Sequence, residues 1–175
     1  MDTQPLTSTV RMHKSLAELL TQDRIINDLQ AADRWQAIDE LLTRLIHTGA
    51  IQAENRAAIA AVVRKREQSM STGIGFGIGI PHATTDCISQ AVAALGRSSR
   101  GIAFDALDGQ PVNLVVLFLV PQGELQQHLH TMAGIAKLLQ HAEIRQALRQ
   151  APDAAAVLQL IRHHEARRAT QTIHP

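Results

Sequence analysis

The pattern of apolar and polar positions predicts a chain built mainly of amphipathic helices. After Asp33, apolar residues recur every three or four positions, as they do on the buried face of a helix, and Gly49 follows the last of them. Asp33 suits the N-cap of this helix, and Gly49 suits the position just past its end. An alanine-rich segment over residues 53–67 predicts a second helix, whose basic last turn suits the negative end of a helix dipole.

The C-terminal third of the chain continues the helical pattern. Residues 125–139 predict a third helix, whose apolar side chains follow one another at spacings of 4, 3, 4 and 3. Two further helices are predicted over residues 142–149 and 152–163, because Pro152 suits the first turn of a helix. The expected buried stripe of the third helix consists of Leu125, Leu129, Met132, Ala136 and Leu139.

Glycine breaks the helical pattern in the middle of the chain. Residues 71–80 read STGIGFGIGI, in which glycine alternates with Ile or Phe. Each interior glycine would cost a helix about 1 kcal/mol relative to alanine, so this segment predicts a strand or loop that other backbone approaches closely. Pro81 then holds Ile80 in extended geometry. On spacing alone, a tightly packed turn and a phosphate cradle of backbone N–H groups both fit the segment.

Two strands are expected after the glycine segment, and they set the fold class. Residues 91–95 are a weak strand candidate, whereas residues 111–120, PVNLVVLFLV, have the length and composition of a strand buried on both faces. Helices that alternate with strands indicate an α/β domain. Residues 1–14 and 165–175 are polar without periodicity, so we expect a flexible N-terminal lead and a flexible tail.

The composition excludes several classes of protein. The 175 residues suit one domain, and a net charge of +1 argues against a dedicated nucleic-acid or anionic-membrane binder. Cys87 is the only cysteine, which excludes an internal disulfide framework and a multi-cysteine zinc finger. The longest apolar run, residues 114–120, is far short of the ~20 residues of a membrane helix. The N-terminus has no apolar signal segment, so we expect a cytoplasmic protein.

His82 follows the glycine segment and Pro81 directly. A lone histidine is more often a structural or surface residue, but a glycine-lined turn fixed by proline is a good place to expose an imidazole. Because histidine ordinarily has a pKa near 6.5, a neutral ring is available as a nucleophile at pH 7. Histidine also forms covalent intermediates in catalysis. His82 is therefore the first candidate for chemistry.

His128 and His130 are separated by helix geometry. A helix advances about 100° per residue, which places His128 about 45° from the centre of the expected buried stripe. The same rotation places His130 on the opposite side of the helix, facing solvent. His128 is thus either a boundary histidine bonded to backbone or a residue that supports a site on the inner surface of the domain.

Nucleotide and metal sites are the competing interpretations of these residues. The dinucleotide pattern G-x-G-x-x-G fails, because isoleucine occupies positions 78 and 80 where the last glycine is required. His128 and His130 diverge on a helix, and no carboxylate completes a convincing metal triad, so we expect neither a metal nor another cofactor. A histidine-based metal-binding or hydrolytic protein remains the alternative from another functional class.

Three ordered motifs resemble the type-2 enzyme IIA domain of the bacterial phosphotransferase system, in its fructose, mannitol and nitrogen-regulatory class. The first is R-E-x₃-STGIG-x-G-I-x-IPHA over residues 66–83. The second is GIAFDALDGQPVNLVVLFLVP over residues 101–121, and the third is HLHTMAGIAKLL over residues 128–139. The resemblance implies one domain over residues 15–164, folded as a mixed β-sheet flanked by helices on both faces.

The resemblance also implies roles for individual residues. In similar domains the histidine of the IPH motif, here His82, receives a phosphoryl group from a phosphohistidine of the carrier protein HPr. The first histidine of the HLH motif, His128, hydrogen-bonds that group, and Arg66 contributes positive charge. Phe76 stands where many relatives carry a polar residue, often Asn; an exposed Phe76 would contact a partner, and a buried one would only pack. The glycine segment would leave room for the carrier protein at Gly75, Phe76, Gly77 and Gly79.

The predicted function is that of a phosphoryl carrier that needs no metal or nucleotide. A free-standing chain without a fused IIB or membrane segment, together with STGIG and HLHT, favours the nitrogen-regulatory branch, in which phosphorylation tunes binding to regulatory target proteins. The alternative is a sugar-transport IIA, which would pass the phosphoryl group to a cysteine of an enzyme IIB.

Overall fold

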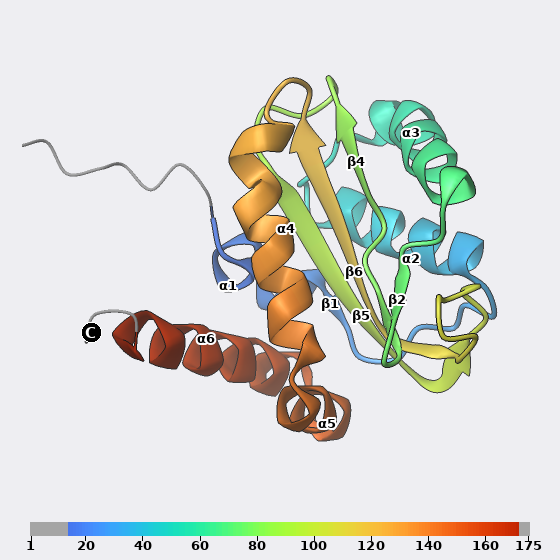
Figure 1. The fold of residues 1–175 in the computed structure, drawn as a ribbon. Helices are drawn as coiled ribbons and strands as arrows, with labels where there is room; N and C mark the ends of the chain where they lie inside the picture. The colour runs from blue at the N-terminus through green and yellow to red at the C-terminus, as the bar shows by residue number, and fades with distance from the viewer. Residues whose placement is uncertain (1–13, 172–175) are drawn as a thin grey trace, which may run out of the picture.

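A six-stranded mixed sheet forms the middle layer of the computed structural model, which describes residues 14–171 (Figure 1). The strands are β1 (Ile25–Ile26), β2 (Gly73–Gly75), β3 (Ile78–Gly79), β4 (His82–Thr85), β5 (Val92–Ile102) and β6 (Val112–Pro121). The strand order is β1-β5-β6-β3-β2, and β4 also pairs with β6. Antiparallel β5 therefore lies on one side of β6, and parallel β3 and β4 lie on the other.

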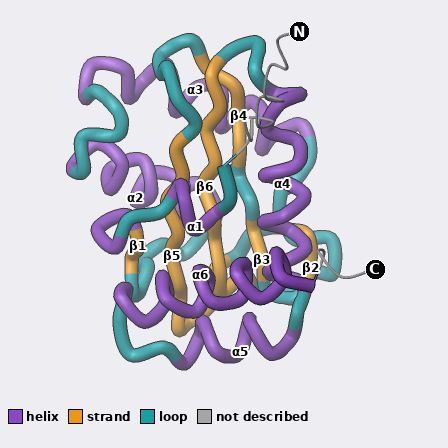
Figure 2. Tube along the Cα trace, turned by 90° about the vertical axis from the view of Figure 1, so that its left-hand side faces the viewer, coloured by secondary structure: helices purple, strands orange, loops and turns teal. Residues whose placement is uncertain are grey.

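Helices cover both faces of this sheet, which Figure 2 shows face-on, with helices in front of the strands and behind them. The helices are α1 (Leu16–Leu19), α2 (Arg34–His47), α3 (Arg56–Ser69), α4 (Leu125–Gln140), α5 (Ala142–Gln150) and α6 (Ala154–Gln171). Helices α1, α4, α5 and α6 pack on one face, and α2 and α3 pack on the other. Helix α3 also lies beside β4. The expected mixed sheet between two helical layers is confirmed.

Strand β6 is the centre of two separate hydrophobic cores. Its side chains alternate between the faces, so that Val116 and Phe118 enter the core under α4, while Val115 and Leu117 enter the core under α2 and α3. All four side chains are fully buried. The apolar run over residues 111–120 therefore forms the doubly buried strand that its sequence predicts.

Most elements lie where the sequence predicts them. Helix α2 has Asp33 as its N-cap, whose Oδ1 accepts a 2.9 Å hydrogen bond from the Gln36 N–H. The glycine segment forms the β2–β3 hairpin. Strand β5 extends to Ile102, well beyond the expected residues 91–95, because β6 supplies a pairing partner along its length. The short strands β1 and β4 were not predicted.

The predicted buried stripe of α4 is wrong at its N-terminal end. Leu125 is 43% exposed and Leu129 is 48% exposed. Further along the helix the prediction holds, because Leu139 is fully buried and Met132 and Ala136 pack against the core. The buried side chains of α4 are His128, Thr131, Ile135, Leu138 and Leu139.

The last helix is longer than predicted and extends into the expected tail over residues 165–175. Helix α6 continues from the expected end at residue 163 to Gln171. Glu165 fixes this extension to the N-terminal part of the chain, because its Oε2 accepts a hydrogen bond of 3.3 Å from the Ala17 N–H. Residues 1–13 of the expected lead over residues 1–14, and the last residues, 172–175, lie outside the described part of the chain.

None of the helices within residues 14–171 combines the length and the apolar character needed to cross a membrane.

Candidate functional site

The β2–β3 hairpin directly precedes the candidate nucleophile in the sequence. Phe76 and Gly77 form its two-residue turn, and both have positive φ, at 57° and 75°. After β3, Pro81 interrupts the strand, but its carbonyl still accepts a 3.0 Å hydrogen bond from the Phe118 N–H of β6. The backbone is thus held in register on both sides of the proline, and His82 begins β4 directly opposite Phe118.

One hydrogen bond assigns the tautomer of His82. Its Nδ1 lies 2.8 Å from the carbonyl oxygen of Ile80. A carbonyl oxygen can only accept, so Nδ1 carries the proton and Nε2 of the neutral ring keeps a free lone pair. Burial lowers the pKa of His82 below its ordinary value of 6.5; the Ile80 hydrogen bond and Glu67 oppose that shift, and the positive charge of Arg66 adds to it. The ring is therefore neutral at pH 7.

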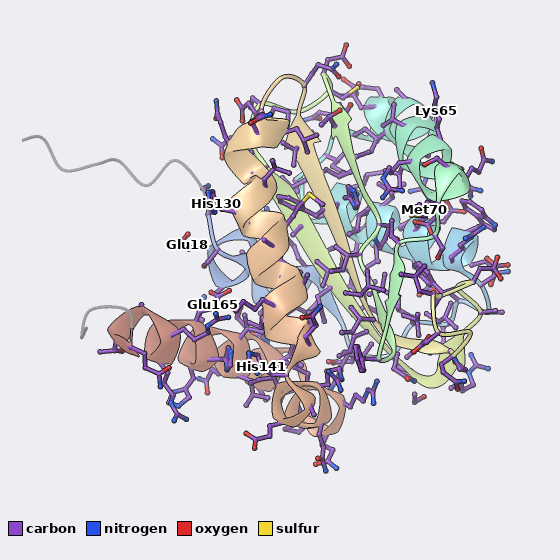
Figure 3. The ribbon with its side chains drawn as sticks, viewed as in Figure 1. Glu18, Lys65, Met70, His130, His141 and Glu165 are labelled. Carbon is purple, nitrogen blue, oxygen red and sulfur yellow. The ribbon has the colours of Figure 1, made fainter. Side chains whose placement is uncertain are left out.

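His82 opens into a cleft of about 540 Å³ between α3 and α4. The α3 wall carries the cationic side chains of Lys65 and Arg66, and the α4 wall carries Leu125 and Leu129. Figure 3 shows Lys65 and Met70 on the α3 side of the molecule, across β4 from α4. The cleft therefore offers one basic wall and one apolar wall, with an imidazole between them.

Arg66 lies where the sequence predicts it. Its Nη1 donates a 2.9 Å hydrogen bond to the Met70 carbonyl at the end of α3, which holds the guanidinium at the cleft. The charge of Arg66 acts on the His82 ring strongly enough to contribute to its lowered pKa. Arg66 can therefore stabilise negative charge that arrives beside His82.

His128 approaches the site from α4 by way of Phe118. In a parallel pair, opposite residues project to the same face, so His82 and Phe118 both point toward the α4 layer. The ring of His128 packs edge-on against Phe118, with 6.1 Å between the ring centroids. His128 is 7% exposed, and among the described residues its buried Nδ1 has no hydrogen-bond partner.

The second ring nitrogen of His128, Nε2, lies near Glu124, the residue just before α4 begins. Its Nε2 lies 3.4 Å from Oε2 of Glu124, one helical turn earlier. Within residues 14–171, no hydrogen bond joins His128 to His82 directly. His130 is exposed, as predicted, and Figure 3 shows it on the side of α4 that is turned away from α3.

None of the residues of the glycine segment, 71–80, lines the cleft. Ile78 pairs with Leu114, whereas His82 pairs with Phe118, four residues further along β6. At about 3.3 Å per residue, the Phe76 turn therefore lies more than about 13 Å from His82 along the sheet. Gly75, Phe76 and Gly77 are thus placed at the far end of the strand from the candidate nucleophile.

The turn at Phe76 is exposed and strained. Phe76 is 60% exposed, and the Arg145 guanidinium lies 4.9 Å from the centroid of its ring. Gly79 is packed inside the fold instead, since a Cβ there would come within 2.8 Å of the ring of Phe104. This close approach is the one that the alternating glycines predict.

Two features of the site were missed in the sequence. Leu125 and Leu129 look like core residues by spacing, yet they form the apolar wall of the cleft. Glu67 is 1% exposed, although a carboxylate beside Arg66 in a basic helix end suggests a solvated side chain. Glu67 belongs to the R-E pair of the first motif, but the resemblance of that motif implies a role for Arg66 alone.

No group of three or more His, Cys, Asp or Glu side chains within residues 14–171 is arranged to hold a metal ion.

A comparison with protein families agrees with this geometry. The family described as "Phosphoenolpyruvate-dependent sugar phosphotransferase system, EIIA 2" matches residues 18–164. The chain belongs to this family. The match includes the hairpin, the proline-fixed histidine, the strand that pairs with it and the helix that carries His128.

Curated relatives of this EIIA chain come from two branches of the family. The nitrogen regulatory protein of Bradyrhizobium diazoefficiens is 32% identical over 146 residues, which are 83% of this chain and 94% of that protein. The fructose-specific EIIABC component of Bacillus subtilis is 35% identical over 150 residues, or 86% of this chain. The chain spans just 23% of that larger protein.

Solved structures share the fold of this EIIA chain. The nitrogen regulatory protein IIA-Ntr of Neisseria meningitidis matches with a TM-score of 0.76 and 28% identity, over 83% of this chain and 97% of that one. The mannitol enzyme IIA of Escherichia coli, solved in complex with phosphorylated enzyme IIB, matches with a TM-score of 0.69 over 86% of this chain and 99% of that one. At 19% identity, the second match shows the fold alone.

Proposed function

We propose that the chain is a phosphoryl carrier that accepts its phosphoryl group on Nε2 of His82. The observation that carries this proposal is the 2.8 Å hydrogen bond between His82 Nδ1 and the Ile80 carbonyl, because it leaves Nε2 as the nucleophilic nitrogen. Membership of the EIIA family supports the same function. The donor is the phosphohistidine of an HPr-type phosphocarrier protein.

The reaction moves one phosphoryl group between two imidazole rings. The Nε2 lone pair of His82 forms a bond to phosphorus while the P–N bond of the donor breaks, and that electron pair returns to the donor ring. Phosphoryl transfer requires mainly positioning and charge stabilisation from the protein. Arg66 supplies positive charge from the α3 wall, and His128 donates a hydrogen bond to the phosphoryl oxygens from the α4 side.

Within the family, we propose a role in the nitrogen-regulatory branch. The Bradyrhizobium nitrogen regulatory protein is matched over 94% of its length, and the Neisseria IIA-Ntr structure has the higher TM-score of the two structures compared above. In this role, the phosphorylation state of His82 controls binding to regulatory target proteins. Leu125 and Leu129 offer an exposed apolar surface for such contacts beside the reacting ring.

A sugar-transport role is the second candidate. It is favoured by the fructose-specific Bacillus relative, which is as similar in sequence as the regulatory one. In this role, phospho-His82 would pass its phosphoryl group to a cysteine thiolate of an enzyme IIB. The complex of the mannitol enzyme IIA with its phosphorylated IIB is an example of such a partner in a protein of the same fold.

The decisive experiment is intact-mass measurement after incubation with phosphoenolpyruvate, enzyme I and HPr. We expect one added phosphoryl group on the wild type, labile in acid and stable in base, and none on His82→Ala. His47→Ala, which changes an exposed histidine of α2, is the matched control and should be phosphorylated like the wild type. An unphosphorylated wild type would refute the carrier function, and a phosphorylated His82→Ala would refute the assignment of the nucleophile.

A second incubation separates the two branches. The isolated phosphoprotein is mixed with fructose-type and mannitol-type enzyme IIB, and the mass of each protein is followed. Retention of the phosphoryl group on the IIA chain supports the regulatory role. Transfer to a IIB cysteine would replace that role with sugar transport.

A further inference from the structure

We propose that Glu67 is a positioning residue that holds His82 in the tautomer and orientation required for phosphoryl transfer. This inference rests on the proposed carrier function, and it assigns to a buried carboxylate a task at the neighbouring imidazole. Glu67 does not line the cleft, so it positions the ring through the backbone that connects α3 to β4, in addition to the effect of its charge on the His82 pKa.

Glu67 fixes the start of the glycine segment with two hydrogen bonds. Its Oε1 accepts a 3.0 Å hydrogen bond from the Thr72 N–H, and its Oε2 accepts one of 2.6 Å from Thr72 Oγ1. Glu67 and Thr72 are 1% and 4% exposed, so water does not compete for these bonds. Arg34 Nη1 lies 3.6 Å from Oε1 and balances the buried charge.

Two more hydrogen bonds connect Thr72 to the ring of His82. The Thr72 carbonyl accepts a 3.0 Å hydrogen bond from the Ile80 N–H. The Ile80 carbonyl in turn accepts the 2.8 Å hydrogen bond from His82 Nδ1. The Glu67 carboxylate and the imidazole are therefore the two ends of one chain of contacts, in which each residue sets the position of the next.

This chain of contacts runs through a rigid part of the fold. The backbone of Gly73 is close against Ala106, and that of Gly79 is close against Phe104, so neither can shift inward. Movement at Thr72 is therefore transmitted to Ile80 through their hydrogen bond. Because the partner of one ring nitrogen decides which nitrogen carries the proton, a displaced Ile80 carbonyl would release the His82 tautomer.

Burying the Glu67 carboxylate at this end of α3 costs folding free energy, which a residue that served only to end the helix would not need. A carboxylate in the last turn of a helix faces the negative end of the helix dipole, and a buried charge is expensive even when it is paired. A neutral side chain could end α3 without either penalty. The carboxylate offers two acceptor atoms at once, and Thr72 uses both.

The test measures the tautomer of His82 by ¹⁵N NMR in the unphosphorylated protein. We expect the Nδ1–H form in the wild type and a mixture of tautomers in Glu67→Ala and Thr72→Val. Thr72→Ser keeps the hydroxyl donor and should restore the wild-type signal. Glu67→Gln keeps one acceptor for the Thr72 N–H and should fall between the wild type and Glu67→Ala.

The phosphorylation rate from phospho-HPr is measured on the same samples. We expect Glu67→Ala to be slower by about tenfold or more, the scale at which residues behind a site's direct ligands typically act. Asp39→Asn is the matched control, because it removes the 2.8 Å ion pair with Arg64 that has no connection to His82. This variant should keep the wild-type tautomer and rate.

A folded Glu67→Ala with the wild-type tautomer and rate would overturn the proposal. If Glu67→Ala does not fold, the comparison of Thr72→Val with Thr72→Ser decides, because that pair differs in the hydroxyl donor while both keep the Thr72 N–H. The NMR measurement needs no phosphoryl donor. A wild type that is not phosphorylated would therefore refute the carrier function separately from the connection between Glu67 and His82.

Discussion

Arg66 and His82 line the same cleft, and the charge of Arg66 contributes to the lowered pKa of the histidine. Burial is the largest cause of the lowered His82 pKa, and the Arg66 charge lowers it further. A lowered pKa keeps the imidazole neutral, and hence nucleophilic, at pH values where a solvated histidine is charged. In the proposed function, Arg66 therefore has two effects: it favours the neutral ring of His82, and its charge can stabilise the incoming phosphoryl group.

The pH dependence follows from this shift. We expect the phosphorylation rate of His82 to fall as the ring becomes protonated, with a midpoint below the ordinary histidine pKa of 6.5. Arg66→Gln removes one cause of the lowered pKa, so the drop should begin at higher pH. Titration of His82 by NMR gives the same midpoints without a donor. A midpoint above 6.5 in the wild type would contradict the burial argument.

At the scale of elements, the β2–β3 hairpin carries strain at its turn. Phe76 has a φ of 57°, in the left-handed region, where a side chain of this kind costs about 1–2 kcal/mol. The Arg145 contact over its ring returns about 0.5–1 kcal/mol at an exposed site. The backbone of the turn is held independently, because the Phe76 N–H donates a 3.0 Å hydrogen bond to Asp108 Oδ2.

Phe76→Asn should therefore stabilise the protein by about 0.5–1 kcal/mol, because asparagine adopts the left-handed region more readily. Phe76→Ala is the matched comparison: it loses the Arg145 contact and keeps the strain, so it should be less stable than the wild type. Urea unfolding measures both. A destabilised Phe76→Asn would mean that the aromatic contact outweighs the backbone strain.

The sequence predicts elements better than it predicts the faces that they present. Helix α2 has a clear helical period and strand β6 is a long apolar run, and both lie where expected. Helix α4 also lies where expected, but Leu125 and Leu129 were assigned to the core. Hydropathy does not distinguish a side chain that packs inside a domain from one that forms the wall of a cleft. Strand β4 has just four residues, and they are too polar to show the alternating pattern of a strand.

The sequence proposes the residues of the site one by one, but it does not predict how they come together. His82 and Arg66 share a cleft as the motifs imply. The approach of His128 depends on the register of β4 against β6 and on contact through Phe118, neither of which can be read from spacing. The role of Glu67 depends on hydrogen bonds to backbone groups, which sequence patterns do not record.

At the scale of the whole molecule, the sheet separates two hydrophobic cores, and one of them adjoins the site. Phe118 and its neighbour Leu117 are both fully buried but point to opposite faces of β6. The ring of Phe118 contacts His128, whereas Leu117 packs in the core of α2 and α3. Damage to the two cores should therefore have different consequences for phosphoryl transfer.

Leu117→Ala should cost about 2–5 kcal/mol of unfolding free energy and leave the phosphorylation rate of the folded protein unchanged. Phe118→Leu should lower that rate, because it removes the aromatic surface against which His128 packs. Urea unfolding and the mass-based rate measurement give the two quantities. Equal rate losses in both variants would mean that the sheet does not isolate the site from the far core.

Helix α3 carries Arg66, and it also lies along β4, which pairs with β6 alone among the described strands. The free side of β4 presents backbone N–H and C=O groups that could accept a strand from another molecule. Because α3 lies along this edge of the sheet, it prevents β4 from pairing with a strand of another molecule. Substitutions that loosen α3 would be expected to reduce soluble yield at high protein concentration, an effect that is separate from any loss of phosphoryl transfer.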